Sequence, residues 1–127
     1  MPHSILIVDD EAPIRDLIRR KLESCGYAVT EAADGRDAIR ALRSQPFNVV
    51  ITDIMMPDTN GIELACHVRK NCPQTKLIAI SAPGNGLFLD SAGGLGAHRT
   101  FSKPLVLADL AAAVGELLGQ PAGTAAQ

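Results

Sequence analysis

The sequence predicts an α/β fold, in which a doubly wound, five-stranded parallel sheet carries helices on both of its faces. Two observations support this prediction. Short apolar runs, which are typical of strands buried on both faces, alternate along the chain with segments whose apolar residues recur at helical spacing. The length of 127 residues also suits a single domain with one substantial core.

The first half of the chain contains three predicted strands and two predicted helices. We expect the strands at residues 5–8, 27–31 and 49–53. The first helix begins near Pro13, whose missing N–H is harmless in a first turn, and ends at Gly26, a residue favoured at helix C-termini. Its apolar face is formed by Ile14, Leu17, Ile18 and Leu22. The second helix lies between Asp34, a candidate N-cap, and Pro46, which stops it.

The second half is less regular because glycines crowd one segment. Two further strands are expected, at residues 77–80 and 100–102. Two helices are expected, at residues 62–70 and 107–118. The intervening segment has five glycines, each costly inside a helix, so only a short, weak helix is expected there, at 87–92. Residues 1–118 then form one domain and residues 119–127 a flexible C-terminal tail.

Composition argues against several classes of function. The formal net charge is −2 and aromatic residues make up 3% of the chain, so neither a basic patch nor a stacking platform for nucleic acid is expected. No apolar run approaches the roughly 20 residues needed to span a membrane. The start lacks the layout of a signal peptide, and the three cysteines lack metal-type spacing. We therefore expect a cytoplasmic protein with reduced thiols and without direct nucleic-acid or membrane binding.

Polar side chains follow four of the five predicted strands at the point where each strand ends. Because the carboxyl ends of parallel strands meet at one edge of a sheet, we expect these side chains to lie close together. They are Asp9 and Asp10, Asp53, Ser81 and Lys103. The second strand contributes Glu31 and two alanines, with no evident reactive group.

This set of side chains suits phosphoryl chemistry. Crowded carboxylates repel one another, and a hard cation with oxygen ligands, such as Mg²⁺, relieves that repulsion. Lys103 and Ser81 offer a positive charge and a hydroxyl to phosphoryl oxygens, and the carboxylate of Asp53 can act as a nucleophile. Each residue alone has a simpler interpretation: acids before a helix favour its dipole, and a single strand-end lysine or serine is usually only solvated. Their joint position at strand ends favours a site.

The ordered motifs resemble those of the receiver domain of two-component response regulators. The residues that carry the resemblance are Ile5-Leu6-Ile7-Val8-Asp9-Asp10-Glu11, Asp53-Ile54-Met55-Met56-Pro57-Asp58 with Gly61, Ser81-Ala82 and Lys103-Pro104. The resemblance covers roughly residues 4–118. It implies a flavodoxin-like fold, similar to that of CheY-type proteins, with the sheet order 2-1-3-4-5.

The resemblance also implies a role for each strand-end residue. Asp53 becomes the phosphoacceptor, and Mg²⁺ is the implied cofactor. Asp10 binds the metal directly, Asp9 binds it through water, and the backbone carbonyl of Met55 completes the protein ligands together with Asp53. Ser81 becomes the switch hydroxyl, and Lys103 pairs with the phosphoryl group.

One departure from the family pattern concerns how the signal is read out. The family usually has an aromatic residue three positions before the lysine, and here that position is Thr100. Phe101 follows it and should point to the opposite face, since strand side chains alternate. Without a ring to rotate, the expected response is an order–disorder change in the glycine-rich segment. The family resemblance and the sharp return of the chain after Lys103 also predict a cis bond between Lys103 and Pro104.

The sequence therefore predicts a phosphoacceptor in signal transduction rather than an enzyme that turns over substrate. Implied partners are a sensor histidine kinase or histidine phosphotransfer protein and a downstream effector; a phosphorylation-dependent dimer is one assembly the resemblance allows. One alternative is an Mg²⁺-dependent aspartyl-phosphate phosphatase, but Met55 occupies the position of the second aspartate such enzymes need. Another is a flavodoxin-like electron carrier, whose flavin phosphate the first acidic loop would repel. Cognate kinase, stimulus, output and any attached domain are left open.

Overall fold

The computed structural model describes residues 3–54, 61–81 and 97–119 and confirms the predicted fold class. Five parallel strands form one sheet in the predicted order, β2-β1-β3-β4-β5. The strands are β1 (Ser4–Val8), β2 (Ala28–Ala32), β3 (Val49–Asp53), β4 (Lys76–Ser81) and β5 (Arg99–Ser102). The described helices are α1 (Ala12–Ser24), α2 (Gly35–Ser44), α3 (Gly61–Asn71) and α5 (Leu107–Leu117).

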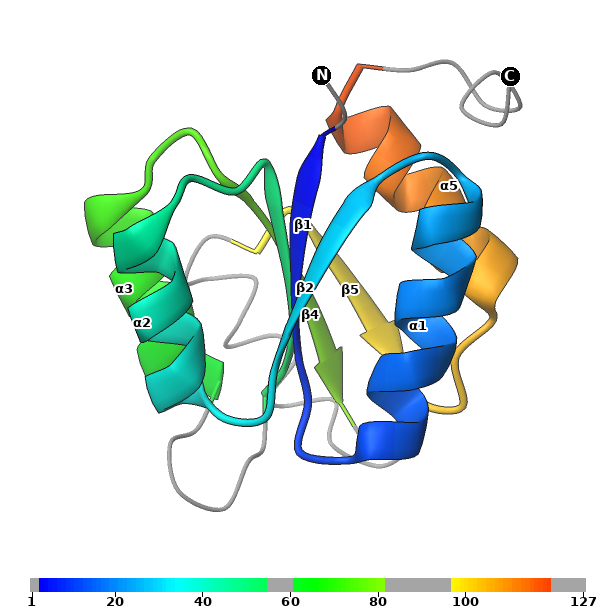
Figure 1. The fold of residues 1–127 in the computed structure, drawn as a ribbon, viewed down its shortest axis with the longest axis horizontal. Helices are drawn as coiled ribbons and strands as arrows, with labels where there is room; N and C mark the ends of the chain where they lie inside the picture. Colours follow the sequence, from blue (N-terminus) through cyan, green and yellow to red (C-terminus); the bar gives the residue numbers. More distant parts are fainter. Residues whose placement is uncertain (1–2, 55–60, 82–96, 120–127) are drawn as a thin grey trace.

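The helices cover both faces of the sheet, α1 and α5 on one side and α2 and α3 on the other (Figure 1). Alternation of side chains between two covered faces explains why β1 is apolar from Ile5 to Val8. Ile5 and Ile7 pack with α1 and α5, whereas Leu6 and Val8 pack with α2 and α3. All four side chains are fully or almost fully buried. After Ser4, β1 therefore has no polar face, and its next polar side chain, Asp9, comes directly after the strand ends.

Helix ends agree with the sequence signals. The side chain of Asp34 accepts a hydrogen bond of 2.8 Å from the backbone N–H of Asp37, which makes it the predicted N-cap of α2. Pro13 lies in the first turn of α1. That helix ends at Ser24 with Cys25 as its C-cap, and Gly26 follows with a φ of 95°, a conformation that favours glycine.

The remaining expectations concern the glycine-rich segment, the C-terminal tail, the Lys103–Pro104 bond, the cysteines and membrane-spanning segments. The expected helix at 87–92 and residues 120–127 of the expected tail lie outside the described residues. The bond between Lys103 and Pro104 is cis, as predicted. All three cysteines are free thiols. Among the described helices, none has the length and apolar character required to cross a bilayer.

Candidate functional site

Strand register brings the predicted polar residues to one edge of the sheet. Val8 of β1 pairs with Thr52 of β3, so Asp9 and Asp53 follow at adjacent positions. On the other side of β3, Asp53 pairs with Ile80, and Ser81 comes one residue later. Ser81 in turn pairs with Ser102, which directly precedes Lys103. The carboxyl ends of four neighbouring strands thus converge, as the sequence pattern predicted.

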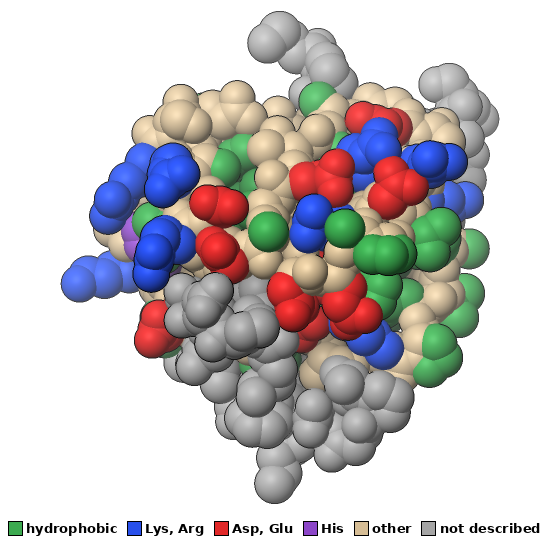
Figure 2. Space-filling view, turned by 60° about the horizontal axis from the view of Figure 1, so that its bottom comes forward, with side chains coloured by type: hydrophobic (Ala, Val, Ile, Leu, Met, Phe, Trp, Pro, Cys, Tyr) green, Lys and Arg blue, Asp and Glu red, His purple; other side chains and the backbone are tan. Residues whose placement is uncertain are grey.

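Three of these residues are buried despite their polarity. Asp9, Asp53 and Ser81 are 1%, 5% and 0% exposed. Asp10 and Glu11 lie at the surface beside them. Figure 2 turns this edge of the sheet toward the viewer and shows acidic side chains gathered on it. Burying carboxylates is costly unless a charge partner compensates them, so the position of the nearest cation decides how the site is held.

That cation is Lys103. Its Nζ donates hydrogen bonds of 3.0 Å to Oδ2 of Asp53 and 3.0 Å to Oε1 of Glu11, and it lies 3.3 Å from Oδ2 of Asp9. Burial acts to lower the pKa of Lys103, but the hydrogen bonds to Asp53 and Glu11, together with the nearby charges, raise it above its ordinary value. The ammonium therefore stays charged and links acids from two separate segments, Asp9 and Glu11 after β1 and Asp53 at the end of β3.

The two carboxylate oxygens of Asp9 differ in their hydrogen bonding to the described residues. Its Oδ1 accepts a hydrogen bond of 2.8 Å from the backbone N–H of Glu11. Its Oδ2 is buried and accepts no hydrogen bond from the described residues, although it lies in an ion pair 3.3 Å from Nζ of Lys103. Burial, helped by the charge of Asp53, raises the pKa of Asp9 above its ordinary value. Oδ2 of Asp9 is thus available to bind a cation or a water molecule that the cation holds.

The acidic cluster fits a hard divalent cation. Carboxylate oxygens of Asp9, Asp10, Glu11 and Asp53 all lie within 4.8 Å of one another. A set of ligands made of oxygen atoms alone suits Mg²⁺. The buried Oδ2 of Asp9, which accepts no hydrogen bond from the described residues, is available to this cation or to water bound to it. Met55, whose carbonyl is an expected ligand, lies outside the described residues.

Backbone hydrogen bonds extend the sheet into the site. The N–H of Lys103 donates to the carbonyl of Ser81 at 2.8 Å, and the N–H of Ile54 donates to the carbonyl of Ile80 at 2.9 Å. The residues that directly follow β3 and β5 are therefore fixed to β4. Ser81 lies fully buried at the end of that strand, next to the positions of both Asp53 and Lys103.

Comparison with known proteins identifies the family. A model described as the response regulator receiver domain matches residues 5–115. The chain belongs to this family. The receiver domain is a signalling domain of two-component systems.

Relatives of this receiver domain include short and long proteins. It is 34% identical over 119 residues to a probable chemotaxis protein CheY of Rhizobium etli, covering 91% of this chain and 92% of the relative. It is 33% identical over 120 residues to the response regulator MprA of Mycolicibacterium vanbaalenii, covering 93% of this chain but only 51% of the relative. The chain thus spans about half of MprA.

A solved structure gives the same result. The CheY-like receiver domain protein from Methanospirillum hungatei superimposes with a TM-score of 0.89 at 30% identity, covering 94% of this chain and 95% of the other.

Two residues of this receiver domain enter the site although the sequence pattern did not select them. Glu11 pairs with Lys103, and Arg15 donates from Nη1 to the carbonyl of Asp9 at 2.7 Å. Arg15 also reaches Glu31 at the end of β2, with Nε at 3.2 Å from Oε1. Glu11 belongs to the acidic run after β1, which could have indicated its role. No local signal reveals the contacts of Arg15, because they join three segments.

The expected orientation of the readout residues is confirmed. Thr100 is exposed, whereas Phe101 packs against the core cluster under α1 and α5. The side chains of Thr100 and Phe101 thus lie on opposite faces of β5. Phe101 packs in the core under α1 and α5, on the face opposite to Thr100. The glycine-rich segment that should respond to phosphorylation lies, up to residue 96, outside the described residues.

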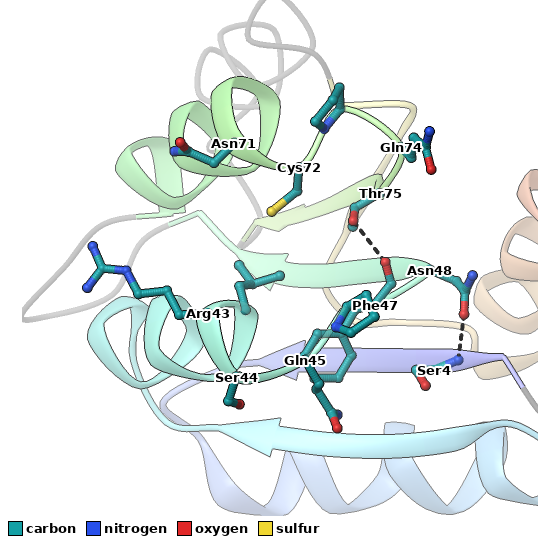
Figure 3. Close-up of a pocket in the computed structure, with 13 residues that line it drawn as sticks. Ser4, Arg43, Ser44, Gln45, Phe47, Asn48, Asn71, Cys72, Gln74 and Thr75 are labelled. Atoms are coloured by element: carbon teal, nitrogen blue, oxygen red, sulfur yellow. Dashed lines mark hydrogen bonds between the residues drawn. The ribbon is translucent and has the colours of Figure 1, made fainter.

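A cavity of about 800 Å³ lies away from the acids, among loops that precede the strands of the sheet (Figure 3). Two hydrogen bonds within the protein join polar groups that line it. The Thr75 hydroxyl donates to the carbonyl of Phe47 at 2.8 Å, and the Ser4 N–H donates to Oδ1 of Asn48 at 2.8 Å. These bonds hold together the chain segments that enter β1, β3 and β4, so we assign the cavity no ligand.

Proposed function

We propose that this receiver domain accepts a phosphoryl group on Asp53 from a phosphohistidine of a sensor histidine kinase or histidine phosphotransfer protein. The observation that carries the proposal is the buried Asp53 carboxylate held 3.0 Å from the Lys103 ammonium, in a cluster with the oxygens of Asp9, Asp10 and Glu11. Such an arrangement positions a carboxylate nucleophile and supplies charge for the phosphoryl oxygens.

The proposed transfer exchanges one bond to phosphorus for another. A carboxylate oxygen of Asp53 forms a bond to phosphorus while the P–N bond of phosphohistidine breaks. The electron pair of that bond stays on the ring nitrogen, and a neutral imidazole leaves if the other ring nitrogen carries the proton. The product is an acyl phosphate, which water later hydrolyses to inorganic phosphate and the restored carboxylate. We propose that the domain assists both steps.

Each residue has a distinct part in the proposal. Asp10 and Asp53 would hold Mg²⁺ directly, Asp9 through water, and the carbonyl of Met55 would complete the set. When bound, the cation supplies positive charge to the phosphoryl oxygens and to the crowded acids. Lys103 moves its ammonium from the Asp53 carboxylate to a phosphoryl oxygen on the same side chain.

Ser81 supplies the link to readout in this proposal. Its hydroxyl lies at the end of the strand next to Asp53, and a hydroxyl can donate to a new phosphoryl oxygen. Movement of Ser81 would change the loop that follows β4. The altered surface then binds a downstream effector, or a second copy of the domain. The alternative of a phosphatase is not proposed, because Met55 stands where its second aspartate is needed.

We place the phosphodonor protein on an apolar groove beside the site. The groove has a volume of about 270 Å³ and lies between α1 and the connection from β5 to α5. Lys103 lines it, and the large apolar side chains of Leu17 and Val106 are 55% and 59% exposed nearby. Because Lys103 both lines this groove and contacts Asp53, the groove adjoins the carboxylate to which a donor would present its imidazole.

The proposal extends to the bounds and location of the domain. We propose that residues 1–118 form the receiver domain and that residues 119–127 lie beyond it. The three free thiols suit a reducing compartment, which supports action in the cytoplasm.

Intact-mass measurement tests the proposed function. The protein is incubated with acetyl phosphate and Mg²⁺, and one labile phosphoryl adduct is expected. Asp53→Asn should abolish the adduct, whereas Asp109→Asn, which changes an exposed acid on α5, should retain it. An adduct of the same stoichiometry in Asp53→Asn would overturn the assignment.

A further inference from the structure

Glu11 follows the acidic pair and is the residue that brings α1 into contact with Lys103. Its Oε1 accepts a hydrogen bond of 3.0 Å from Nζ of Lys103, across 92 residues of sequence. Its backbone is the N-cap of α1, but its side chain makes no capping hydrogen bond. The carboxylate is therefore not engaged with the helix end, as acids in such positions often are.

The backbone of Glu11 is held firmly, so its side chain starts from a defined point. Its N–H donates to Oδ1 of Asp9 at 2.8 Å, and its carbonyl accepts from the N–H groups of Ile14 and Arg15, both at 3.1 Å. The side chain is 55% exposed, whereas the side chain of Lys103 is 13% exposed. Glu11 therefore covers the ammonium from the solvent side.

Lys103 divides its hydrogen bonds between Glu11 outside and Asp53 inside. Both bonds measure 3.0 Å. A phosphoryl group on Asp53 would place further negative charge next to the same ammonium. Glu11 would then compete with that group for Lys103 and repel it, because two anions close to one cation weaken each other's binding.

We infer that Glu11 is a positioning residue that holds Lys103 in the unphosphorylated domain and, by its charge, disfavours phosphodonors that carry two negative charges. This inference rests on the proposed function. It goes beyond the transfer itself, because it makes Glu11 a determinant of which phosphodonors the domain prefers. The donor's charge matters because the Glu11 carboxylate lies on the exposed side of the site, where a donor approaches.

Two small phosphodonors separate the effect of charge from that of shape. Near neutral pH acetyl phosphate is a dianion and phosphoramidate a monoanion. With either donor, an Asp53 oxygen bonds to phosphorus; the P–O bond breaks to release acetate, or the P–N bond breaks to release ammonia. The readout is the ratio of the two initial rates at saturating Mg²⁺ and fixed ionic strength.

Glu11→Gln keeps the length of the side chain and removes its charge. We expect it to raise the ratio of acetyl phosphate to phosphoramidate rates by about threefold to tenfold, as one partly screened charge near the donor would. The increase should shrink in high salt. Glu116→Gln is the matched control, since Glu116 is 54% exposed and pairs with Arg99 at the opposite end of β5. Its ratio should equal that of the wild type.

A second readout needs neither metal nor phosphodonor. In the metal-free protein, nitrogen-15 NMR of the lysine ammonium groups should show a protected Lys103 signal, because hydrogen bonds slow its proton exchange. Glu11→Gln and Glu11→Asp should both change that signal, since the first removes charge and the second shortens the reach. Glu11→Asp should keep the wild-type donor ratio, because the charge remains.

The outcomes distinguish this inference from the proposed function. If the wild type is phosphorylated and Glu11→Gln leaves the donor ratio unchanged, the inference is wrong and the proposed function stands. An unchanged Lys103 signal in Glu11→Gln also overturns it. If the wild type accepts a phosphoryl group from neither donor, the proposed function fails and the inference fails with it.

Discussion

The Nζ of Lys103 and the Oδ2 of Asp53 lie 3.0 Å apart across 50 residues of sequence. Each residue follows or ends a different strand, and β4 lies between those strands. The contact therefore depends on the order of the sheet as well as on the two residues. It places the Lys103 ammonium beside the carboxylate that we propose to be phosphorylated.

Asp9 should make the stability of the metal-free protein depend on pH. Burial raises the pKa of Asp9 in the folded state, so folding favours its protonated form. The stability that this protonated carboxyl contributes is present below the unfolded pKa and is lost as the pH rises through the folded pKa. Asp9→Asn does not titrate, so at neutral pH it should unfold at higher urea concentration than the wild type.

The advantage of Asp9→Asn should shrink as the pH falls toward 3.8, the ordinary pKa of an aspartate side chain. Glu116→Gln, an exposed change at the other end of the sheet, serves as the control for general loss of negative charge. Urea unfolding at a series of pH values measures the difference. A wild type that is more stable than Asp9→Asn at neutral pH without metal would contradict the assigned cost of burying Asp9.

Substitution of Asp10 should weaken Mg²⁺ binding, whereas substitution of Lys103 should not. Asp10→Asn removes a proposed direct ligand and should weaken binding at least about tenfold, or roughly 1.4 kcal/mol. Lys103→Ala removes a cation that pairs with the same acids, so it should retain Mg²⁺ binding while slowing phosphorylation. Isothermal titration calorimetry measures both affinities. Unaltered Mg²⁺ affinity in Asp10→Asn would exclude the acidic cluster as the metal site.

Arg15 should stabilise the loop that carries the acids. Its guanidinium donates to the Asp9 carbonyl at 2.7 Å and pairs with Glu31 at 3.2 Å. Arg15→Ala removes a charged donor from a partly buried acceptor and should lower the free energy of unfolding by about 1–3 kcal/mol. Arg20→Ala on the same helix, which removes a pair 72% exposed on its arginine side, should cost less than about 0.5 kcal/mol. Equal costs for the two variants in urea unfolding would contradict this role.

Substitution of Leu17 should slow phosphoryl transfer from protein donors but not from small-molecule donors. Leu17→Lys places a charge at the exposed edge of the groove beside Lys103, where we expect an apolar partner surface. Phosphoryl transfer from a histidine phosphotransfer protein that phosphorylates the wild type should slow at least about tenfold, roughly 1.4 kcal/mol. The rate with acetyl phosphate should be unchanged. A parallel loss with both donors would indicate damage to the site rather than to docking.

The sequence predicted the sheet and most of the site because both depend on short-range patterns. Apolar runs set the strands, and the first polar residue after each run marks the edge where Asp9, Asp53 and Lys103 meet. The pairing of Glu11 with Lys103 could not be predicted, because a long side chain can take many rotamers and its partner is 92 residues away. The contacts of Arg15 with Asp9 and Glu31 could not be predicted for the same reason.

Chemical trapping of the phosphorylated residue tests the central claim most directly. The protein is phosphorylated with acetyl phosphate and Mg²⁺ and then treated with borohydride, which reduces an acyl phosphate on aspartate to homoserine. Peptide mass spectrometry then locates the homoserine. The account predicts homoserine at position 53 and nowhere else in the chain. Homoserine at position 9 or 10 with an intact Asp53 would contradict it.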